Sequence, residues 1–436
     1  MKAAKKIAPK LTHVQTKFGV EEYKLSNGLR LLYKRERSAP VVGVCVTFHV
    51  GSRNEAKGHT GATHILEHLL FKDSKKFNKA NGKEIGGYLD WMGAIMNATT
   101  WFDRTNYFEV LPREHLKEAL ELEADRMRDS LFSEADLASE MTVVRNEFER
   151  TRNSPFELLD EEVMLKAFSK HPYRIPTIGT KEDIEHSTAL KLREFYNTFY
   201  WPNNATLSVF GDVPFTEVKR LVLTYFGPIP HSPHKIPEMT TVEPPQTKPL
   251  KVLLKKPFGV NIVSLTYKIP RATDPDFPSI YVLGVLLAAG FSSRLQKALV
   301  DTGLATDLQL QLPALRDPGV IVFTAHLSDN VVPSKALSVM RRVITELQKT
   351  LPHKDELDRA KERLSTQISY ERDGVYVDIR AVSESIAAGD WALGYRMEKL
   401  ISAVLPRDVL RVAKKYLIAS QETTGILVHQ QTTEKK

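Results

Sequence analysis

An internal repeat at half the chain length constrains the fold more than any other feature of this sequence. Residues Thr188–Gly211 and Pro406–Gln430 share one pattern, a helix, a polar break and a strand, at an offset of about 217 residues. Each half also opens with strands and continues through helices. The repeat predicts an α+β fold of two similar domains, each a mainly antiparallel sheet backed by helices.

A proline-rich stretch separates the two halves. Seven prolines lie from Pro228 to Pro249, a composition that is typical of an extended, semi-rigid linker. We therefore predict an N-terminal domain over 1–228, a linker over 229–249 and a C-terminal domain over 250–436. The length agrees with this division, because 436 residues exceed what one ordinary hydrophobic core can organise.

The segment His64-Ile65-Leu66-Glu67-His68 carries the clearest chemical signal. On a helix, His64, Glu67 and His68 share one face, because residues three and four apart are neighbours. Two imidazoles one turn apart suit a zinc ion, and a carboxylate beside them can accept a proton from water. The alternative is a pair of ordinary surface histidines. The second half has no such motif at the matching place, so we expect metal chemistry in the first domain alone.

Two histidines leave a catalytic zinc ion short of one protein ligand. The single cysteine, Cys45, lies in an apolar strand pattern, which predicts a buried hydrophobic residue rather than a ligand. The remaining candidates, between which sequence spacing does not choose, are His59, Asp73, Glu84, Glu140 and Glu147.

Charge and apolar patterns exclude several classes of function. The excess of 61 Lys and Arg over 53 Asp and Glu is mild, and no nucleic-acid-binding module accompanies it. No apolar run reaches the length that a membrane-spanning helix needs. The start of the chain lacks an apolar signal segment, so we expect a cytoplasmic protein, with the periplasm as the alternative if a signal peptide has been removed.

Several motifs together resemble the M16 family of metallopeptidases, the inverzincins. The similarity is strongest to the two-domain subunits of its B group, which includes bacterial zinc peptidases and mitochondrial processing peptidase. The matching segments, in chain order, are Leu25–Arg30, Gly51–Arg53, His64–Lys72, Gly93, Asn97–Thr99, Asp103–Tyr107 and Glu140–Glu147. The resemblance covers the whole chain and is strongest over residues 20–213.

The resemblance implies a catalytic site with one zinc ion per chain. His64, His68 and Glu147 would bind the metal, and Glu67 would act as the general base. Glu140 would be a supporting carboxylate that orients a ligand. The implied activity is that of a zinc-dependent endopeptidase subunit.

The resemblance also implies how a peptide substrate binds. Asn97, Ala98 and Thr99 would form a sheet edge on which an extended or unfolded peptide adds as a further strand. Hydrogen bonds between main chains would then supply affinity with little demand on the peptide's sequence.

The sequence departs from the family's pattern in its second half. Active members often carry an Arg and a Tyr after the Ser-Arg-Leu motif, which is Ser293-Arg294-Leu295 here. The expected places fall at about Leu299 and Thr306, which cannot donate hydrogen bonds as Arg and Tyr do. Our hypothesis is that a second M16B-type subunit supplies the pair and completes a heterodimeric clamshell, of which this chain is one half; a homodimer is the alternative.

Two other functions compete with the peptidase. The first is a non-catalytic structural or assembly subunit of the same fold, which should have lost part of the site. His64, Glu67, His68 and Glu147 are all present. The second is a zinc protein that hydrolyses another kind of bond, against which only the resemblance of the Asn97–Thr99 segment argues.

Overall fold

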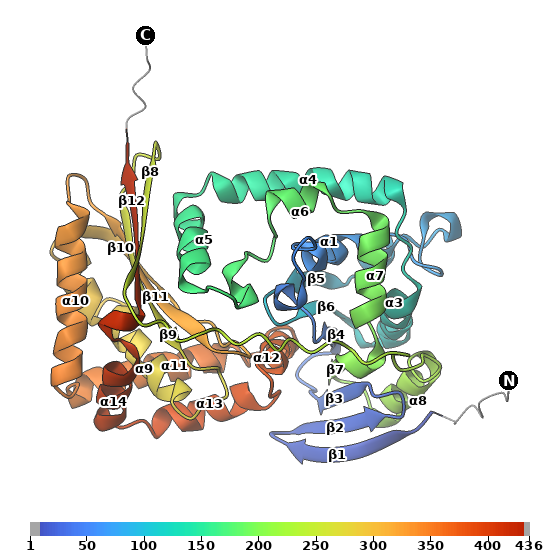
Figure 1. Ribbon diagram of the computed structural model, residues 1–436. Helices are drawn as coiled ribbons and strands as arrows, with labels where there is room; N and C mark the ends of the chain where they lie inside the picture. Colours follow the sequence, from blue (N-terminus) through green and yellow to red (C-terminus); the bar gives the residue numbers. More distant parts are fainter. Residues whose placement is uncertain (1–8, 431–436) are drawn as a thin grey trace, which may run out of the picture. The chain divides into compact units, whose positions relative to one another are not determined.

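The chain forms two compact units of mixed α and β structure. A computed structural model describes residues 9–430 (Figure 1). Unit 1 consists of the chain up to Arg145, Thr177–Thr240 and Glu371–Ala387, and unit 2 consists of Asn146–Pro176, Thr241–Tyr370 and the chain from Ala388. Each unit is built on one sheet, so the predicted α+β class with two mainly antiparallel sheets is confirmed.

Unit 1 contains a seven-stranded sheet in the order β1-β2-β3-β7-β4-β6-β5. Its strands are β1 (Leu11–Lys17), β2 (Val20–Leu25), β3 (Arg30–Arg35), β4 (Val41–Phe48), β5 (Ile95–Thr100), β6 (Thr105–Pro112) and β7 (Ala205–Gly211). β3 and β7 run parallel, and the other neighbouring pairs of this sheet are antiparallel. β5 is therefore an edge strand, hydrogen-bonded to β6 alone within the described sheet.

The helices of unit 1 cover both faces of this sheet. They are α1 (Ala62–Leu69), α2 (Ile85–Trp91), α3 (Leu116–Asp129), most of α4 (Glu134–Arg152), α6 (Lys181–Glu185), α7 (Ala189–Phe199), α8 (Phe215–Tyr225) and α12 (Val375–Ala387). Side chains alternate between the faces of β4. Gly43 and Thr47 of β4 meet α12, and a Cβ at Gly43 would lie 2.7 Å from Val375 Cγ1. On the opposite face, the Tyr107 hydroxyl of β6 lies 3.5 Å from the Leu66 carbonyl of α1.

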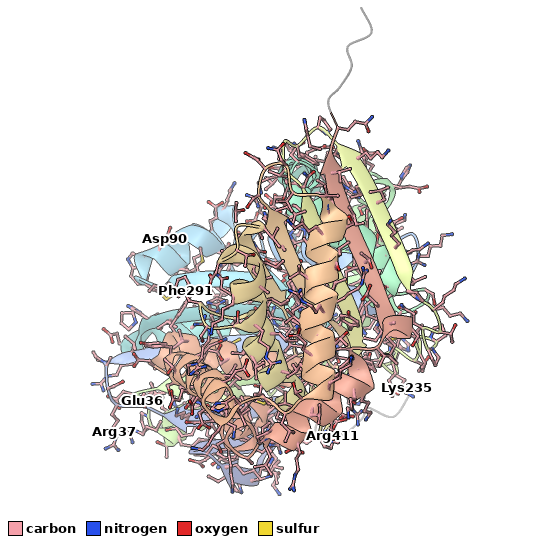
Figure 2. All side chains as sticks on the ribbon, turned by 90° about the vertical axis from the view of Figure 1, so that its left-hand side faces the viewer. Glu36, Arg37, Asp90, Lys235, Phe291 and Arg411 are labelled. Carbon is pink, nitrogen blue, oxygen red and sulfur yellow. The ribbon has the colours of Figure 1, made fainter. Side chains whose placement is uncertain are left out.

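Unit 2 contains a five-stranded sheet in the order β10-β11-β9-β12-β8. Its strands are β8 (Leu250–Lys256), β9 (Ile262–Ile269), β10 (Ala305–Gln311), β11 (Gly319–Leu327) and β12 (Glu422–His429). Its helices are α5 (Pro155–Ala167), α9 (Phe277–Ala288), α10 (Pro333–Lys349), α11 (Lys354–Tyr370), α13 (Leu393–Ser402) and α14 (Pro406–Tyr416). Figure 2 shows α10 lying along the sheet, where it contacts β9.

Short helical turns connect several of these elements. They are η1 (Ser52–Asn54), η2 (Lys79–Asn81), η3 (Arg113–His115), η4 (Pro172–Arg174), η5 (Pro202–Asn204), η7 (Ala419–Gln421) and the π-helical η6 (Gln296–Val300). The predicted repeat is visible in them, because α7, η5 and β7 follow one another in unit 1 as α14, η7 and β12 do in unit 2. The sheets match as well: β3-β7-β4-β6-β5 has the same order and the same parallel pair as β8-β12-β9-β11-β10.

Each unit takes one helix from the other half of the sequence. α12 belongs to the second half of the chain but packs on β4, β6 and β7 of unit 1. α5 belongs to the first half but packs on β8, β9 and β12 of unit 2. Both helices come close at a glycine: a Cβ at Gly425 of β12 would lie 2.7 Å from Val163 Cγ2 of α5. The compact units thus differ in their bounds from the domains 1–228 and 250–436 that the sequence predicts. Those domain bounds remain a prediction.

The proline-rich segment has no helix or strand between Tyr225 and Leu250. Its later part is nevertheless held in place in unit 2, because the Glu243 carboxylate accepts hydrogen bonds from the backbone N–H groups of Ser169, Lys170 and His171 at 2.6–2.9 Å. Among residues 9–430, no helix is long and apolar enough to cross a membrane. The first residues, on which the expected compartment rests, lie outside the described part, so that expectation stays a prediction.

Candidate metal centre

Helix α1 is anchored firmly at its N-terminus. Gly61 precedes the helix with φ of 86°, a value that favours glycine. The Glu55 carboxylate accepts hydrogen bonds from the Gly61 and Thr63 N–H groups, each at 2.8 Å, and from the Thr63 hydroxyl. Burial raises the pKa of Glu55 to about 7. The start of the metal-site helix is therefore fixed by the half-buried side chain of Glu55, for which the sequence predicted no role.

One face of α1 packs in the core and the other carries the candidate ligands. Ile65, Leu66 and Leu69 are fully buried, whereas His64, Glu67 and His68 are half-buried. The Nε2 atoms of His64 and His68 lie 3.4 Å apart. The helical spacing therefore brings both imidazoles to one point, as the motif predicts.

A carboxylate from α4 joins the two imidazoles. His64, His68 and Glu147 each offer one ligand atom, and these atoms lie within 4.8 Å of one another. Of the five candidates for the third ligand, Glu147 is the one that the structure brings into this group. In the described part of the chain, this is the group of three His, Cys, Asp or Glu side chains that could hold a metal ion.

Glu140, two turns before Glu147 on α4, contacts the outer side of His68. Its Oε2 lies 3.1 Å from His68 Nδ1, and its Oε1 lies 2.6 Å from Lys72 Nζ. Burial acts to raise the pKa of Glu140, but the hydrogen bonds from Lys72 and His68 outweigh it and hold the pKa below its usual value. The ionised carboxylate can therefore accept a hydrogen bond from Nδ1–H, and this tautomer of His68 has its free lone pair on Nε2.

Lys72 was not assigned a role from the sequence. It lies beyond the end of α1 at Leu69, so the periodicity of the helix does not extend to it. Its contact with the supporting carboxylate therefore had no signal in the helical spacing.

The donor set fits a zinc ion. Burial, with a smaller contribution from His68, lowers the pKa of His64 to about 4, so that this imidazole is neutral and able to bind metal at pH 7. Two imidazoles and one carboxylate form a ligand set known for catalytic zinc, and three protein ligands leave a fourth position for water or substrate. The described site contains no thiolate, because the only cysteine, Cys45, is buried in β4, as predicted.

Glu67 lies on the same helix between the two histidines. Burial raises the pKa of the buried phenols of Tyr107 and Tyr200. The negative charge of Glu67 raises the pKa of both groups further. A half-buried carboxylate beside two imidazoles is placed to exchange protons with a bound molecule.

The predicted peptide-binding residues lie on β5, which contacts α1. Asn97 is exposed, Ala98 is buried and Thr99 is half-buried. The Ala98 N–H donates to Asn97 Oδ1 at 2.8 Å. A side chain thus satisfies a backbone donor on the strand that ends the sheet, and a peptide strand could replace it.

The second-half positions that the family comparison singled out have no catalytic features of their own. Leu299 is fully buried in η6, and the Thr306 hydroxyl donates to the His326 carbonyl at 3.3 Å. Arg294 of the Ser-Arg-Leu motif donates to both carboxylate oxygens of Glu356, at 2.7 and 2.9 Å, which indicates a structural role. Phe291, just before the motif, is 91% exposed and is labelled in Figure 2.

Comparison with known proteins agrees with this geometry. A family model described as insulinase (peptidase family M16) matches residues 30–181, and one described as peptidase M16 inactive domain matches residues 187–364. The chain is similar to zinc protease PqqE of Helicobacter pylori, with 30% identity over 419 residues, covering 93% of this chain and 92% of that protein. It is also 25% identical to the uncharacterized zinc protease YmxG of Bacillus subtilis over 346 residues, 79% of this chain and 82% of that protein.

A solved structure shows the same fold. The crystal structure of a protease from Helicobacter pylori superimposes with a TM-score of 0.88 at 29% identity, covering 96% of this chain and 100% of that one. A peptidase M16 inactive domain from Pseudomonas fluorescens has a TM-score of 0.83 at 19% identity, covering 94% of this chain and 99% of that one. The second likeness concerns the fold alone.

Proposed function

This chain belongs to peptidase family M16, and on that premise we propose that it is a zinc-dependent endopeptidase subunit that hydrolyses extended or unfolded peptides. The observation that carries the proposal is the convergence of His64, His68 and Glu147, whose ligand atoms lie within 4.8 Å of one another. These residues would hold one zinc ion per chain. A zinc ion bound there would lower the pKa of its water molecule towards neutrality and polarise a peptide carbonyl.

Glu67 is the general base in this proposal. Its carboxylate accepts a proton from the water molecule that attacks the peptide carbonyl, and it then gives that proton to the leaving amine nitrogen. Glu140 does not touch the substrate. It accepts a hydrogen bond from His68 Nδ1 and so keeps the ring in the orientation and tautomer that present Nε2.

The edge strand β5 binds the substrate in this proposal. An extended peptide pairs with Asn97, Ala98 and Thr99, and the Ala98 N–H exchanges its bond to Asn97 Oδ1 for a peptide carbonyl. Strand addition uses main-chain groups, which every peptide has, so it suits substrates that are unfolded rather than substrates of one sequence.

A second M16B-type subunit completes the site in this proposal. A tetrahedral oxyanion needs hydrogen-bond donors aimed at it, and neither the buried Leu299 nor the short side chain of Thr306 supplies what Arg and Tyr would. The partner is either a different subunit or a second copy of this chain. Full turnover by the isolated monomer would remove the need for one.

Zinc content and peptide cleavage, measured together, test the function. We expect the purified full chain to bind one zinc ion and, with its partner, to cleave denatured β-casein until a chelator is added. Glu147→Gln should weaken zinc binding by more than about 100-fold. This exceeds the usual effect of removing a residue that only hydrogen-bonds to a metal ligand. The matched control is Glu149→Gln, an exposed carboxylate on the same helix.

The outcomes separate the competing functions. A native protein that holds no zinc would exclude every enzymatic function proposed for this site. A protein that binds zinc through Glu147 but cleaves no peptide, even when co-purified with its partners, would instead be a structural or assembly subunit.

A further inference from the structure

Arg104 is a buried arginine in the turn between β5 and β6, next to the proposed peptide-binding strand. Its residue is 6% exposed. Its Nη1 donates to the carbonyl oxygen of Thr99 at 2.7 Å and to the Thr99 hydroxyl at 2.6 Å. One guanidinium nitrogen therefore holds both the backbone and the side chain of the residue that follows Ala98.

The other side of the Arg104 guanidinium is held by α12. Nε donates to Glu384 Oε1 at 3.1 Å, and Nη2 donates to the same oxygen. Glu384 comes from the second half of the sequence, but α12 packs within unit 1. A charge-assisted contact with two donors is directional as well as strong, so Glu384 limits the orientations that Arg104 can adopt.

A second chain of hydrogen bonds runs beside the first. The Thr99 hydroxyl donates to Asn106 Oδ1 at 2.8 Å, and Asn106 Nδ2 donates to Ser383 Oγ of α12 at 2.7 Å. The Ser383 hydroxyl in turn lies 2.8 Å from Thr47 Oγ1 of β4. Asn106, Ser383 and Thr47 are almost fully buried. Such a satisfied buried network is rigid, because each broken bond would leave a polar group without water.

An edge strand needs this kind of support more than a central strand does. β5 pairs with β6 on one side only, so half of its backbone groups make no bond within the sheet. A peptide that adds to the open side of β5 loses conformational freedom on binding. If β5 were itself mobile, it would also have to become ordered, and the entropic cost of binding would be larger. A strand that is already fixed binds the peptide more tightly.

We propose that Arg104 is a positioning residue for peptide binding, which fixes Thr99 of the edge strand and is itself held by Glu384 of α12. The inference rests on the proposed function of β5. It means that α12, a helix from the second half of the chain, contributes to the affinity for the substrate. Arg104 does not touch the zinc ligands, so its effect falls on peptide binding and not on metal binding.

Peptide affinity, measured in protein that cannot turn over, tests the proposal directly. Fluorescein-labelled denatured β-casein is titrated into full-length Glu67→Gln protein, alone and combined with Glu384→Gln, Arg104→Met or Arg104→Lys. We expect Arg104→Met to raise the peptide Kd roughly tenfold, which is less than the roughly 10²-fold loss of rate that a misplacement of about 1 Å can cause at a reacting centre. Glu384→Gln should give a smaller rise, and Arg104→Lys should restore part of the affinity. Zinc Kd should stay within about twofold in every variant.

Asp378→Asn is the matched control. Asp378 lies on the same helix and forms an ion pair with Lys34 of β3 at 2.7 Å, three strands away from β6 in the sheet order. If general loosening of α12 were the cause, this variant would weaken peptide binding as much as Glu384→Gln does. Equal effects in the two variants would overturn the proposal.

Two further results would overturn it. One is an unchanged peptide Kd in both Glu384→Gln and Arg104→Met. The other is a parallel loss of zinc affinity in Glu384→Gln, whose side chain is 53% exposed. Failure of the proposed function looks different, because wild-type protein would then hold no zinc or cleave no β-casein.

Discussion

Five strands of the unit 1 sheet have the same order as the five strands of the unit 2 sheet, but the helices that follow the matching strands β4 and β9 differ in chemistry. The helix that follows β4 in unit 1 is α1, and the helix that follows the equivalent strand β9 in unit 2 is α9. In α1, His64, Glu67 and His68 are half-buried on one face. In α9, every residue except Tyr281 is buried.

The difference between α1 and α9 lies in what covers each helix. Three helices, α11, α13 and α14, pack against α9. The sequence of α9 contains no charged residue, so this packing buries no charge. The outer face of α1 instead receives a carboxylate from α4. Helices at equivalent places of one topology thus differ: α9 is part of a buried core, whereas α1 leaves the face with the two candidate imidazole ligands accessible.

Among the variants that test the contrast between α1 and α9, Glu67→Gln is expected to have the largest effect, which falls on kcat. The variant should retain zinc and lose about 10²–10⁴-fold in kcat, because the amide cannot accept the proton of the attacking water. Peptide turnover and zinc content are measured on the same sample. Glu362→Gln, an exposed carboxylate on α11 of unit 2, should leave kcat unchanged. If Glu67→Gln still turned over peptides at the normal rate, the assignment of chemistry to α1 would be wrong.

Leu283→Ala tests the opposite role of α9. Leu283 is 1% exposed in the core of unit 2, so the variant should lose about 2–5 kcal/mol of unfolding free energy. Zinc Kd, measured below the unfolding transition, should not change. Denaturant unfolding gives the free energy, and Leu253→Ala, 50% exposed on β8, is the control expected within about 0.5 kcal/mol of wild type. A loss of zinc affinity in Leu283→Ala would break the division of roles.

Glu140→Gln should have a smaller effect, and one confined to the metal. The amide keeps the shape of the carboxylate but accepts more weakly from His68 Nδ1 and loses the ion pair with Lys72. Zinc affinity should fall by roughly 10–100-fold, as for other outer partners of metal-bound histidines. Competition with a chelator of known affinity measures it. The same affinity in Glu140→Gln and wild type would show that His68 needs no such support.

The smallest effect is expected in unit 2, at Glu243. Burial acts to raise its pKa, but hydrogen bonds from Ser169, His171 and Lys170 outweigh it and lower the pKa to about 2 from an ordinary value of 4.5. The lowered pKa stabilises the fold above pH 4.5, and this contribution disappears as pH falls from 4.5 to about 2. Because the side chain is only half-buried, solvent screens this contribution, and Glu243→Gln should cost less than about 1 kcal/mol at pH 7.

The measurement for Glu243 is the pH dependence of unfolding. Wild type and Glu243→Gln should differ most above pH 4.5 and converge towards pH 2. A constant difference across that range would mean that the carboxylate's charge is not what holds the proline-rich segment in unit 2. Zinc affinity at pH 7 should be the same in both proteins.

Much of the site was predictable because its signal is local. His64, Glu67 and His68 share a helix face through spacing alone, and α1 has that face accessible. The half-chain repeat likewise predicted two similar sheets, which the matching strand orders confirm. Sequence spacing left five candidates for the third ligand, and the resemblance to the family was needed to favour Glu147.

The exchange of helices could not be predicted in the same way. α5 and α12 each bury a set of apolar residues, but the presence of apolar residues on a helix does not state which sheet they will cover. The close approaches at Gly43 and Gly425 belong to contacts between residues hundreds of positions apart. Neither glycine is distinguished in the sequence from one in an ordinary strand.

By itself, the sequence determined the repeat and the meeting of two imidazoles on α1, because periodicity and spacing along one helix are properties of neighbouring residues. Only the tertiary structure decided that Glu147 of α4 meets these imidazoles and that Glu140 contacts both His68 and Lys72. It also decided that Glu384 of α12 contacts Arg104, next to the edge strand. Those contacts join segments far apart in the chain. Their geometry is set by how whole helices and sheets pack, which local spacing does not encode.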